Sequence, residues 1–448
     1  MSEAYSIGIV GAGFTGALLA AHLARQARGP LRIALIERRG EFGPGLAYST
    51  KDAGHLLNVR ASNMSAFPDD PDHFIRWLAK RDGGKAAHGS TGLVFATRRD
   101  YGAYIAEVLD EATQNSASAQ VERVYGEAVA LTPVPNGVRL QLDGLRHIDV
   151  RQVALCTGHL RPLPPSSLGL DVLNSDRYVP DPWDERAFDQ LDKDARVIVL
   201  GSGLTMVDVV LTLLSKGHRG DILALSRRGL LPSPHADITP FVSGLLRDGF
   251  PDTVRGLLRA LRRDAARAEA LGLGWRSAFD ALRPHHHKIW RGLSLTEKRR
   301  FIRHVRPYWD IHRHRMAPQV ARRIEELLAD ERLSVRAGRL ENVALTSDGL
   351  TATVRPRSGG PTWSVEATAL INCSGPSSDY YRARDPIVQV ALEQGLARPD
   401  PLNLGLDVTP EGALIGVDGR PSRHLFAFGP LSKAPFYEMT AVPELRGQ

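Results

Sequence analysis

Cysteine is nearly absent from this chain, which has two among its 448 residues, Cys156 and Cys373. They form no CxxC pair, so the sequence argues against a dithiol redox centre of the kind found in disulfide reductases. Each cysteine ends an apolar run, and an unpaired cysteine in that setting behaves as a small hydrophobic residue. We therefore expect both thiols to be buried and inert.

Long apolar runs are also missing. No stretch approaches the roughly 20 apolar residues that a membrane helix needs. The N-terminus enters a predicted strand at once and lacks the charged region, apolar core and cleavage site of a secretory signal. The composition, 43% hydrophobic and 24% charged, is ordinary for a globular protein and leaves room for two or three domains. The sequence predicts a cytoplasmic protein without a membrane segment.

Positive charge is concentrated in one part of the chain. Residues 251–320 hold sixteen Lys and Arg against six Asp and Glu, whereas the rest of the chain carries a small negative net charge. This excess indicates either a nearby anionic ligand or a solvated basic helix surface, and both readings stay open. Because no aromatic stacking platform or base-reading motif accompanies it, we expect no nucleic-acid partner.

A glycine-rich turn follows the first predicted strand. Residues 7–10 are apolar, the turn reads Gly11-x-Gly13-x-x-Gly16, and residues 17–28 and 31–36 are typical of a helix and a second strand. The first glycine permits a tight turn, the second lets a pyrophosphate approach the backbone, and the third lets helix and strand pack closely. The helix N-terminus then faces the phosphates.

Glu37 ends the second strand of this unit, 21 positions after Gly16. A carboxylate here accepts hydrogen bonds from both hydroxyls of an adenosine ribose and repels a 2′-phosphate. The first unit is therefore predicted to bind a dinucleotide with an unmodified ribose, and we assign FAD to it.

A second unit of the same kind begins near residue 196. Its turn, Gly201-Ser-Gly203-Leu-Thr-Met206, keeps the first two glycines and loses the third. Its second strand, within residues 221–225, ends in Ser226-Arg227-Arg228 instead of a carboxylate. Guanidinium groups bind phosphate through a planar, two-point fork. The second unit is therefore predicted to bind NADPH rather than NADH.

The two units predict an α/β fold with two Rossmann-like dinucleotide-binding domains and a basic helical extension. In this interpretation the FAD-binding domain is discontinuous and comprises residues 1–165 and 331–448. An NAD(P)-binding unit, residues 190–239, is inserted between them. The basic helical extension follows that unit at residues 240–330.

Further motifs extend across the chain: GPGLAY at 43–48, HLLNV at 55–59, SNMS at 62–65, PDDPDHF at 68–74, YWDIHRHRMAP at 308–318 and EMTAVPELR at 438–446. With the two turns, they resemble the FAD-NAD(P)-binding family of bacterial two-dinucleotide flavoproteins. That family is related to the flavin-dependent N-hydroxylating monooxygenases and, more loosely, to nitrosuccinate-synthase-like enzymes. One departure is Gly429-Pro430, where many such flavoproteins have Gly-Asp.

The turns and the resemblance together give two sets of expected cofactor contacts. For FAD they are Gly11, Gly13, Phe14, Thr15, Gly16, Glu37, Arg38, Asn58, Val59, Ser62, Asn63, Met64, Val129, Thr157, Gly158, Gly429, Thr440 and Ala441. For NADPH they are Gly201, Ser202, Gly203, Thr205, Ser226, Arg227 and Arg228.

The resemblance implies a flavin-dependent NAD(P)H oxidoreductase. The leading hypothesis is a monooxygenase that uses dioxygen, through a flavin hydroperoxide, to hydroxylate a small polar amine or carboxylate. The alternatives are a reductase serving a protein or quinone acceptor and a non-catalytic cofactor-binding protein. Candidates for holding a substrate carboxylate are Arg283, Arg291, Arg313 and Arg315. Because the consecutive histidines 285–287 point around a helix rather than to one face, we expect no metal site.

Overall fold

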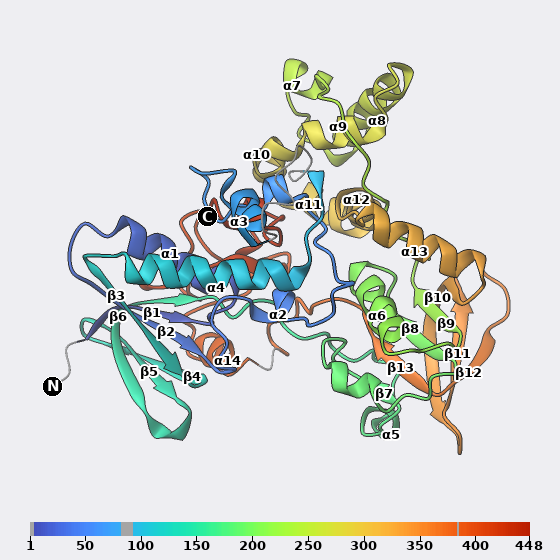
Figure 1. The fold of residues 1–448 in the computed structure, drawn as a ribbon, viewed down its shortest axis with the longest axis horizontal. Helices are drawn as coiled ribbons and strands as arrows, with labels where there is room; N and C mark the ends of the chain where they lie inside the picture. The colour runs from blue at the N-terminus through green and yellow to red at the C-terminus, as the bar shows by residue number, and fades with distance from the viewer. Residues whose placement is uncertain (1–3, 82–92, 383–384) are drawn as a thin grey trace.

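The computed structural model describes residues 4–81, 93–382 and 385–448. Two sheets form the two halves of the molecule, and a group of helices projects above the junction between them (Figure 1). The predicted α/β fold with two Rossmann-like sheets and a helical extension is confirmed.

The first sheet has eight strands, and its main path runs β14-β15-β6-β1-β2-β3. A hairpin, β4 and β5, attaches to β6 through β5. Along the path β3-β2-β1-β6-β15, each strand is parallel to its neighbours, so the carboxyl ends of these five strands share one edge. The bounds are β1 Tyr5–Val10, β2 Leu31–Glu37, β3 Ala119–Tyr125, β4 Ala128–Val134, β5 Gly137–Leu142, β6 His147–Leu155, β14 Ala413–Ile415 and β15 Pro421–Ala427.

The second sheet has seven strands in the order β12-β11-β10-β9-β8-β13-β7. Its centre is parallel, and β11 and β12 extend it as antiparallel strands. The bounds are β7 Tyr178–Val179, β8 Val197–Leu200, β9 Ile222–Ser226, β10 Leu333–Leu345, β11 Leu350–Pro356, β12 Trp363–Ala367 and β13 Ala369–Asn372.

This topology corrects the predicted domain boundaries. We expected residues 331–448 to belong wholly to the FAD-binding domain and residues 190–239 to form the whole NAD(P)-binding unit. Instead, β13 lies between β7 and β8, and the first half of β10 pairs with β9. The second sheet therefore spans residues from 178 to 372. Residues 119–134 form two strands, β3 and β4, of which β3 is parallel to β2.

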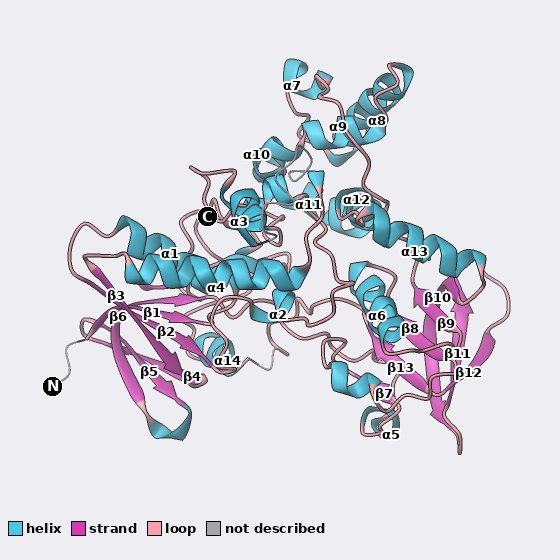
Figure 2. Ribbon diagram, viewed as in Figure 1, coloured by secondary structure: helices cyan, strands magenta, loops and turns pink. Residues whose placement is uncertain are grey.

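Helices cover both sheets, as Figure 2 shows. Helices α1 and α4 pack together over the first sheet, and α14 packs on β4. Helices α6 and α13 share a hydrophobic cluster with the second sheet. The bounds are α1 Phe14–Gln26, α2 Gly45–Tyr48, α3 His73–Arg81, α4 Arg98–Gln114, α5 Leu170–Leu173, α6 Leu204–Ser215, α13 Pro318–Ala329, α14 Pro386–Glu393 and α15 Val442–Leu445.

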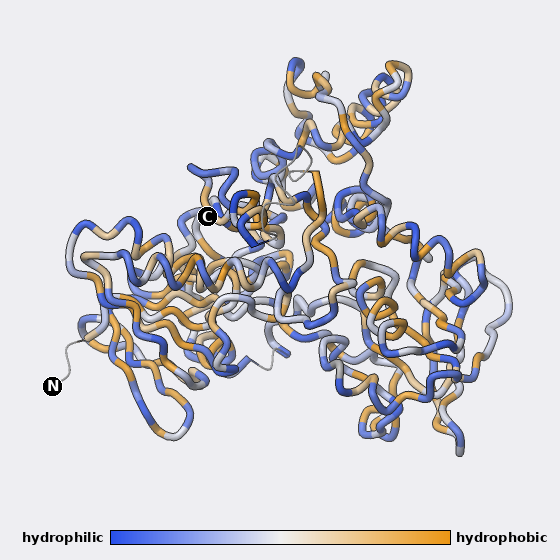
Figure 3. Tube along the Cα trace, in the orientation of Figure 1, coloured by the Kyte–Doolittle hydropathy of each residue, from blue (hydrophilic) through white to orange (hydrophobic). Residues whose placement is uncertain are grey.

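The helical extension comprises α7 to α12 and has its own apolar clusters. Helix α8 carries many arginines and also buries Val254, Ala260 and Leu261 along one face. The bounds are α7 Gly244–Asp248, α8 Val254–Ala270, α9 Trp275–Ala281, α10 His286–Gly292, α11 Leu295–Arg300 and α12 Arg306–Arg313, with a π-helical turn, Phe301–Val305, between the last two. Apolar segments run through the strands of both halves (Figure 3). Among the described residues no helix is long and apolar enough to span a bilayer.

A buried polar cluster fastens the two halves together. The Arg98 guanidinium, at the start of α4, lies 2.8 Å from the Asp208 carboxylate of α6, and about a tenth of each side chain is exposed. His55 binds across the same interface, because its Nε2 lies 3.0 Å from both Asp208 O and Thr212 Oγ1. Burial raises the pKa of Asp208, and the charge of Arg98 opposes that rise.

We predict that Arg98→Met destabilises the protein by roughly 3 kcal/mol, because it leaves the buried Asp208 carboxylate without a counter-charge. The matched control is Arg139→Met, which breaks the ion pair between β5 and Asp149 of β6, where both side chains are more than 40% exposed. That control should cost at most about 1 kcal/mol. Urea unfolding measures both values, and equal losses would contradict the assigned role of the Arg98–Asp208 pair.

Candidate cofactor and active site

The carboxyl edge of the first sheet gathers the residues predicted to hold FAD. The strand order places β1 between β2 and β6, so Gly11, Glu37 and Thr157 lie at the carboxyl ends of three adjacent parallel strands. Gly429 follows β15, which pairs with β6 on its other side. Ligands of open α/β sheets bind at such an edge, where neighbouring connections leave to opposite sides.

Gly11 makes the turn after β1 possible. Its φ is +95°, and a Cβ on it would lie 2.5 Å from Cys156 O. A Cβ on Gly16 would lie 1.9 Å from Gly11 O, so only glycine lets α1 approach the turn this closely. Helix α1 starts at Phe14 with Gly13 as its N-cap and no side-chain cap. The amides of its first turn are thus left for a ligand.

Glu37 is fixed at the edge by two backbone amides. Its Oε2 accepts from Ala12 N at 2.9 Å, and its Oε1 accepts from Arg39 N at 3.0 Å. Arg38 points elsewhere, into an ion pair with Glu127 at 2.7 Å. The carboxylate is therefore oriented, half-buried and beside the glycine turn, as a ribose-binding group must be.

The remaining predicted FAD contacts divide by exposure. The side chains of Phe14, Val59 and Met64 are buried in the hydrophobic core, so only their backbones can meet a ligand. Val129 lies at a β-bulge of β4, where it has no opposite residue in the ladder. Those left half-buried or exposed are Asn58, Ser62, Asn63, Thr157, Gly158, Thr440 and Ala441.

Gly429 lies against the first helix, because a Cβ on it would be 2.7 Å from Thr15 Oγ1. Its amide donates to the side chain of Gln448 at 2.9 Å. This contact ties the C-terminal segment to the carboxyl edge. Thr440 and Ala441 precede the single turn of α15, with Ala441 as its N-cap.

The second sheet repeats this geometry at its own carboxyl edge. A Cβ on Gly201 would lie 2.2 Å from Cys373 O, and α6 also begins after a glycine without a side-chain cap. Met206 stands where the first unit has its third glycine, and it is fully buried. Thr205 lies in the first turn of α6, and Gly203 has open space around it.

Ser226 occupies the place that Glu37 has in the first unit. Its Oγ lies 2.8 Å from Ser202 Oγ and accepts from Gly229 N at 2.9 Å. Arg228 lies over the Tyr308 ring at 5.2 Å and donates to its hydroxyl. Arg227 is exposed, and no described residue forms an ion pair with it. One guanidinium therefore remains available at this edge.

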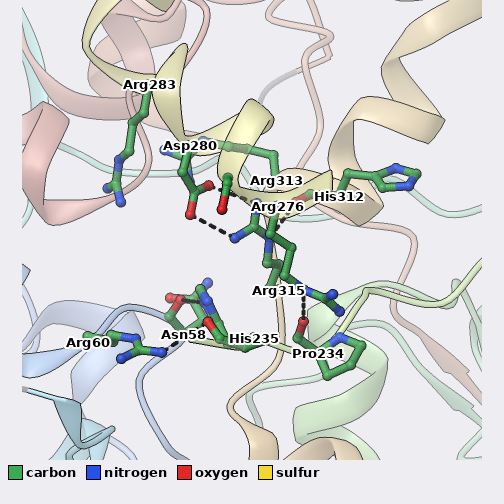
Figure 4. Close-up of polar contacts among 12 residues, drawn as sticks. Asn58, Arg60, Pro234, His235, Arg276, Asp280, Arg283, His312, Arg313 and Arg315 are labelled. Carbon is green, nitrogen blue, oxygen red and sulfur yellow. Dashed lines mark hydrogen bonds and ion pairs between the residues drawn. The ribbon is translucent and has the colours of Figure 1, made fainter. Parts of the chain in front are cut away.

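Three parts of the chain meet at one place: the segment with Asn58 and Arg60, the loop after β9, and helix α9 (Figure 4). His235, in the loop after β9, donates from Nε2 to Asn58 O at 3.0 Å. Burial lowers the pKa of His235 to about 4, so the ring is neutral at pH 7. Arg60 binds the same loop at Ala236 O and Asp237. Arg276 of α9 donates to Pro234 O at 2.9 Å.

The four arginines predicted to hold a substrate carboxylate have partners within the protein. Arg315, 2% exposed, pairs with Asp280 through two hydrogen bonds of 2.8 and 3.0 Å. Arg291 lies over the Phe436 ring at 5.0 Å. Arg283 and Arg313 both bind Glu444, at 3.1 and 2.9 Å. Their predicted role in substrate binding stays a prediction.

Glu438, Glu444 and Arg313 form a buried ionic cluster that the sequence did not reveal. Arg313 Nε donates to Glu438 at 2.7 Å, and Trp309 Nε1 donates to the other oxygen of that carboxylate, also at 2.7 Å. Burial alone would raise the pKa of Glu438, but Arg313, two nearby imidazoles and the Trp309 bond lower it to about 2.

His286 lies close enough to both carboxylates for the three ligand atoms to fall within 4.8 Å. Arg313 already supplies the positive charge that these carboxylates require, so we assign no metal to the group. Glu438 and Glu444 both belong to the EMTAVPELR motif at 438–446, which was the one sequence signal that could have identified them as functional candidates.

The comparisons agree with this geometry. Residues 8–160 match the model of a family described as FAD-NAD(P)-binding. An ornithine N-hydroxylase from Kutzneria sp. 744 has the same fold, with a TM-score of 0.66 and 16% identity over 99% of this chain and 96% of that one. L-lysine 6-monooxygenase from Pseudomonas syringae has a TM-score of 0.65 and 16% identity over 99% and 97%. Ornithine hydroxylase from Pseudomonas aeruginosa has a TM-score of 0.66 and 14% identity over 99% and 97%.

A search among curated proteins gives no match. The resemblance inferred from the sequence is confirmed by the family match and by this shared fold.

We predict that Arg313→Met destabilises the protein by about 3–5 kcal/mol at pH 7.5, because Glu438 loses its main counter-charge. In the wild type, Glu438 contributes stability that is present above its unfolded pKa of 4.5 and lost as pH falls toward 2. In the variant, burial raises that pKa above 4.5, so the deficit should shrink between pH 7.5 and pH 5.

Urea unfolding at both pH values measures this change. The control is Arg323→Met, which removes an exposed ion pair with Glu326 on α13 and should have a small effect at either pH. A deficit for Arg313→Met that is the same at pH 5 and pH 7.5 would refute the assigned electrostatic role.

Proposed function

We propose that this protein is an FAD-dependent, NADPH-using monooxygenase that hydroxylates the nitrogen of a small amine. The observation that carries the proposal is the pair of uncapped glycine turns at two parallel-sheet edges, one beside a carboxylate and one beside a free guanidinium. The match to an FAD-NAD(P)-binding family supports the cofactors. The fold shared with ornithine and lysine N-hydroxylating enzymes supports the reaction class.

The residues at the first edge fit FAD. Each carboxylate oxygen of Glu37 accepts a hydrogen bond from one backbone amide, and this fixes the orientation of the remaining lone pairs toward ribose hydroxyls. Helix α1 offers the unpaired amides of its first turn to the pyrophosphate. By contrast, α4 and α8 each begin after a threonine whose side chain accepts a hydrogen bond from an amide in the first turn of the same helix. Helices α9 and α13 also lack a side-chain cap, so what distinguishes α1 and α6 is that each follows a glycine turn at the edge of a parallel sheet.

The residues at the second edge fit NADPH. Ser226 is neutral, so nothing there repels a 2′-phosphate, and Arg227 provides a charge without a partner among the described residues. The solved structure of the Kutzneria ornithine N-hydroxylase holds reduced FAD and NADP+ together with L-ornithine.

When bound, FAD supplies the redox chemistry, accepting a hydride from the nicotinamide and activating dioxygen. The protein contributes orientation and exclusion of water. The His55, Arg98 and Asp208 contacts fix the distance between the two edges. His235 and Arg276 join the loop after β9 to the Asn58 segment and to α9 through hydrogen bonds to backbone carbonyls. Both cysteines are buried, which raises their pKa values, so neither thiol is suited to pass electrons to a disulfide.

We expect the purified protein to be yellow and to oxidise NADPH in air in the presence of an amine substrate, forming one hydroxylamine per NADPH. Mass spectrometry of the product and an assay for hydrogen peroxide measure this coupling. NADPH oxidation that reduces dyes or quinones without forming a hydroxylated product would support the alternative reductase function. A colourless protein that takes up no added FAD would overturn the proposal.

Arg227→Ala should raise KM for NADPH roughly tenfold to a hundredfold and change KM for NADH less than threefold, because it removes one charge-assisted contact to the 2′-phosphate. The matched control is Arg219→Ala, just before the other end of β9, where the arginine pairs with Asp194 on the surface. Steady-state kinetics with both nucleotides gives the comparison. Equal effects of Arg227→Ala on NADPH and NADH would exclude a 2′-phosphate contact.

A further inference from the structure

The helical extension contains a partly enclosed cavity, and no predicted cofactor contact lines it. It lies among α7, α8, α10, the π-helical turn and α12, and the C-terminal segment before Met439 closes one end. Its volume is about 90 Å³, several times the roughly 10–15 Å³ that one water molecule requires on the same measure. Most of its wall is apolar and includes Leu257, Leu261, Ile289, Trp290 and Phe301.

The polar end of the cavity is formed by His286, Tyr437 and Glu438. Both oxygens of Glu438 are taken by Trp309 and Arg313. The other two residues each end in a buried atom, His286 Nε2 and the Tyr437 hydroxyl, that has no hydrogen-bond partner among the described residues. Buried polar groups are nearly always paired, so two such atoms on one cavity point to a missing ligand.

The protonation of His286 defines what that ligand must offer. Its Nδ1 hydrogen-bonds Arg283 O, and since a carbonyl oxygen only accepts, Nδ1 carries the proton. Burial lowers the pKa of His286, so the ring is neutral and Nε2 is an acceptor. Tyr437 supplies a hydroxyl that can donate. The complementary group therefore has at least one N–H or O–H and one lone pair.

The electrostatics of this end favour an uncharged ligand. The carboxylates of Glu438 and Glu444 are balanced by the guanidiniums of Arg313 and Arg283. Among the described residues, Glu438 is the one charged side chain on the cavity wall, and Arg313 already pairs with it. An ammonium or carboxylate that enters this apolar space would lose its hydration without a free counter-charge.

Tyr437 is held in an uncommon conformation at this place. Its φ is +64°, in the left-handed region that a bulky residue rarely adopts. Its ring packs on Trp290 at 4.6 Å and on Phe301 at 5.1 Å, which keeps the side chain in position. Strained backbone of this kind persists where the surroundings fix it, and it is frequent at ligand sites.

We propose that this cavity binds the apolar body of the substrate, and that the substrate is a weakly basic, uncharged aromatic amine whose N–H donates to His286 Nε2. Tyr437 and Glu438 directly precede Met439, Thr440 and Ala441, two of which are predicted FAD contacts. An amine held at the polar end is therefore close in the chain to the proposed cofactor site. The substrate class differs from the ornithine and lysine named for the enzymes of similar fold.

The assignment of the amine rests on the proposed function, whereas the apolar, uncharged character of the ligand rests on the cavity alone. A binding experiment without NADPH separates the two. Isothermal titration of the FAD-loaded protein compares 4-methylaniline, which is neutral at pH 7.5, with the cationic 4-methylbenzylamine and with L-ornithine. We expect 4-methylaniline to bind at least tenfold more tightly than either.

Leu261→Trp fills the cavity and should abolish that binding without changing FAD content. Its control is Leu246→Trp on α7, where the leucine is 41% exposed and outside the cavity wall. Because a tryptophan at 261 can disturb folding, Leu257→Phe and Tyr437→Phe provide milder changes, each expected to weaken binding at least fivefold.

Tighter binding of L-ornithine, or unchanged 4-methylaniline binding in Leu261→Trp and Leu257→Phe, would overturn the proposal. Binding of 4-methylaniline that is lost in these variants, without any hydroxylated product on addition of NADPH, would support the cavity and count against the monooxygenase function. Hydroxylation of ornithine or lysine with no affinity for 4-methylaniline would support the function and refute the cavity.

Discussion

A close contact between a glycine and a carbonyl oxygen at the end of a neighbouring strand sets the geometry of both halves of this protein. Gly11 lies against Cys156 O, and Gly201 lies against Cys373 O, so that any side chain would collide at either place. Each contact brings the start of a helix to the carboxyl edge of a parallel sheet. Both helices begin there without a side-chain cap. The open amides that favour a phosphate follow from this packing.

The two edges share a backbone arrangement and differ in charge. At the first, Glu37 is held by backbone amides and faces the turn as an anion. At the second, Ser226 is a neutral member of a serine pair, and Arg227 adds a positive charge beside it. In the function proposed above, this difference in charge lets one scaffold discriminate between two adenine dinucleotides. The buried Arg98–Asp208 pair then fixes the two edges relative to each other.

Local sequence patterns were sufficient to predict the parts of the fold whose determinants are neighbours in the chain. The turns at Gly11 and Gly201, the helices after them and the strand-end residues Glu37 and Ser226 all lie within about 40 residues of their partners. The pairing of β13 with β8 joins segments more than 150 residues apart, and similar apolar strands gave no indication of which sheet they enter. The domain boundaries were wrong for that reason.

The same limit applies to the site. Arg313 was identified as a functional candidate, but its partners Glu438 and Glu444 lie 125 and 131 positions away, so its ion pairs were invisible in the sequence. The basic excess of residues 251–320 is now partly explained, because Arg283, Arg313 and Arg315 neutralise carboxylates rather than stand free. The apolar cavity beside them arises only when α8, α10 and the C-terminal segment come together.

The proposed function requires two separate nucleotide sites in one chain. Equilibrium dialysis of the apoprotein against FAD and NADP+ together tests it directly. We expect one FAD and one NADP+ per chain, with the affinity for each nucleotide unchanged by saturation with the other, or lowered less than twofold. Displacement of FAD by NADP+, with a total of one nucleotide bound per chain, would contradict it.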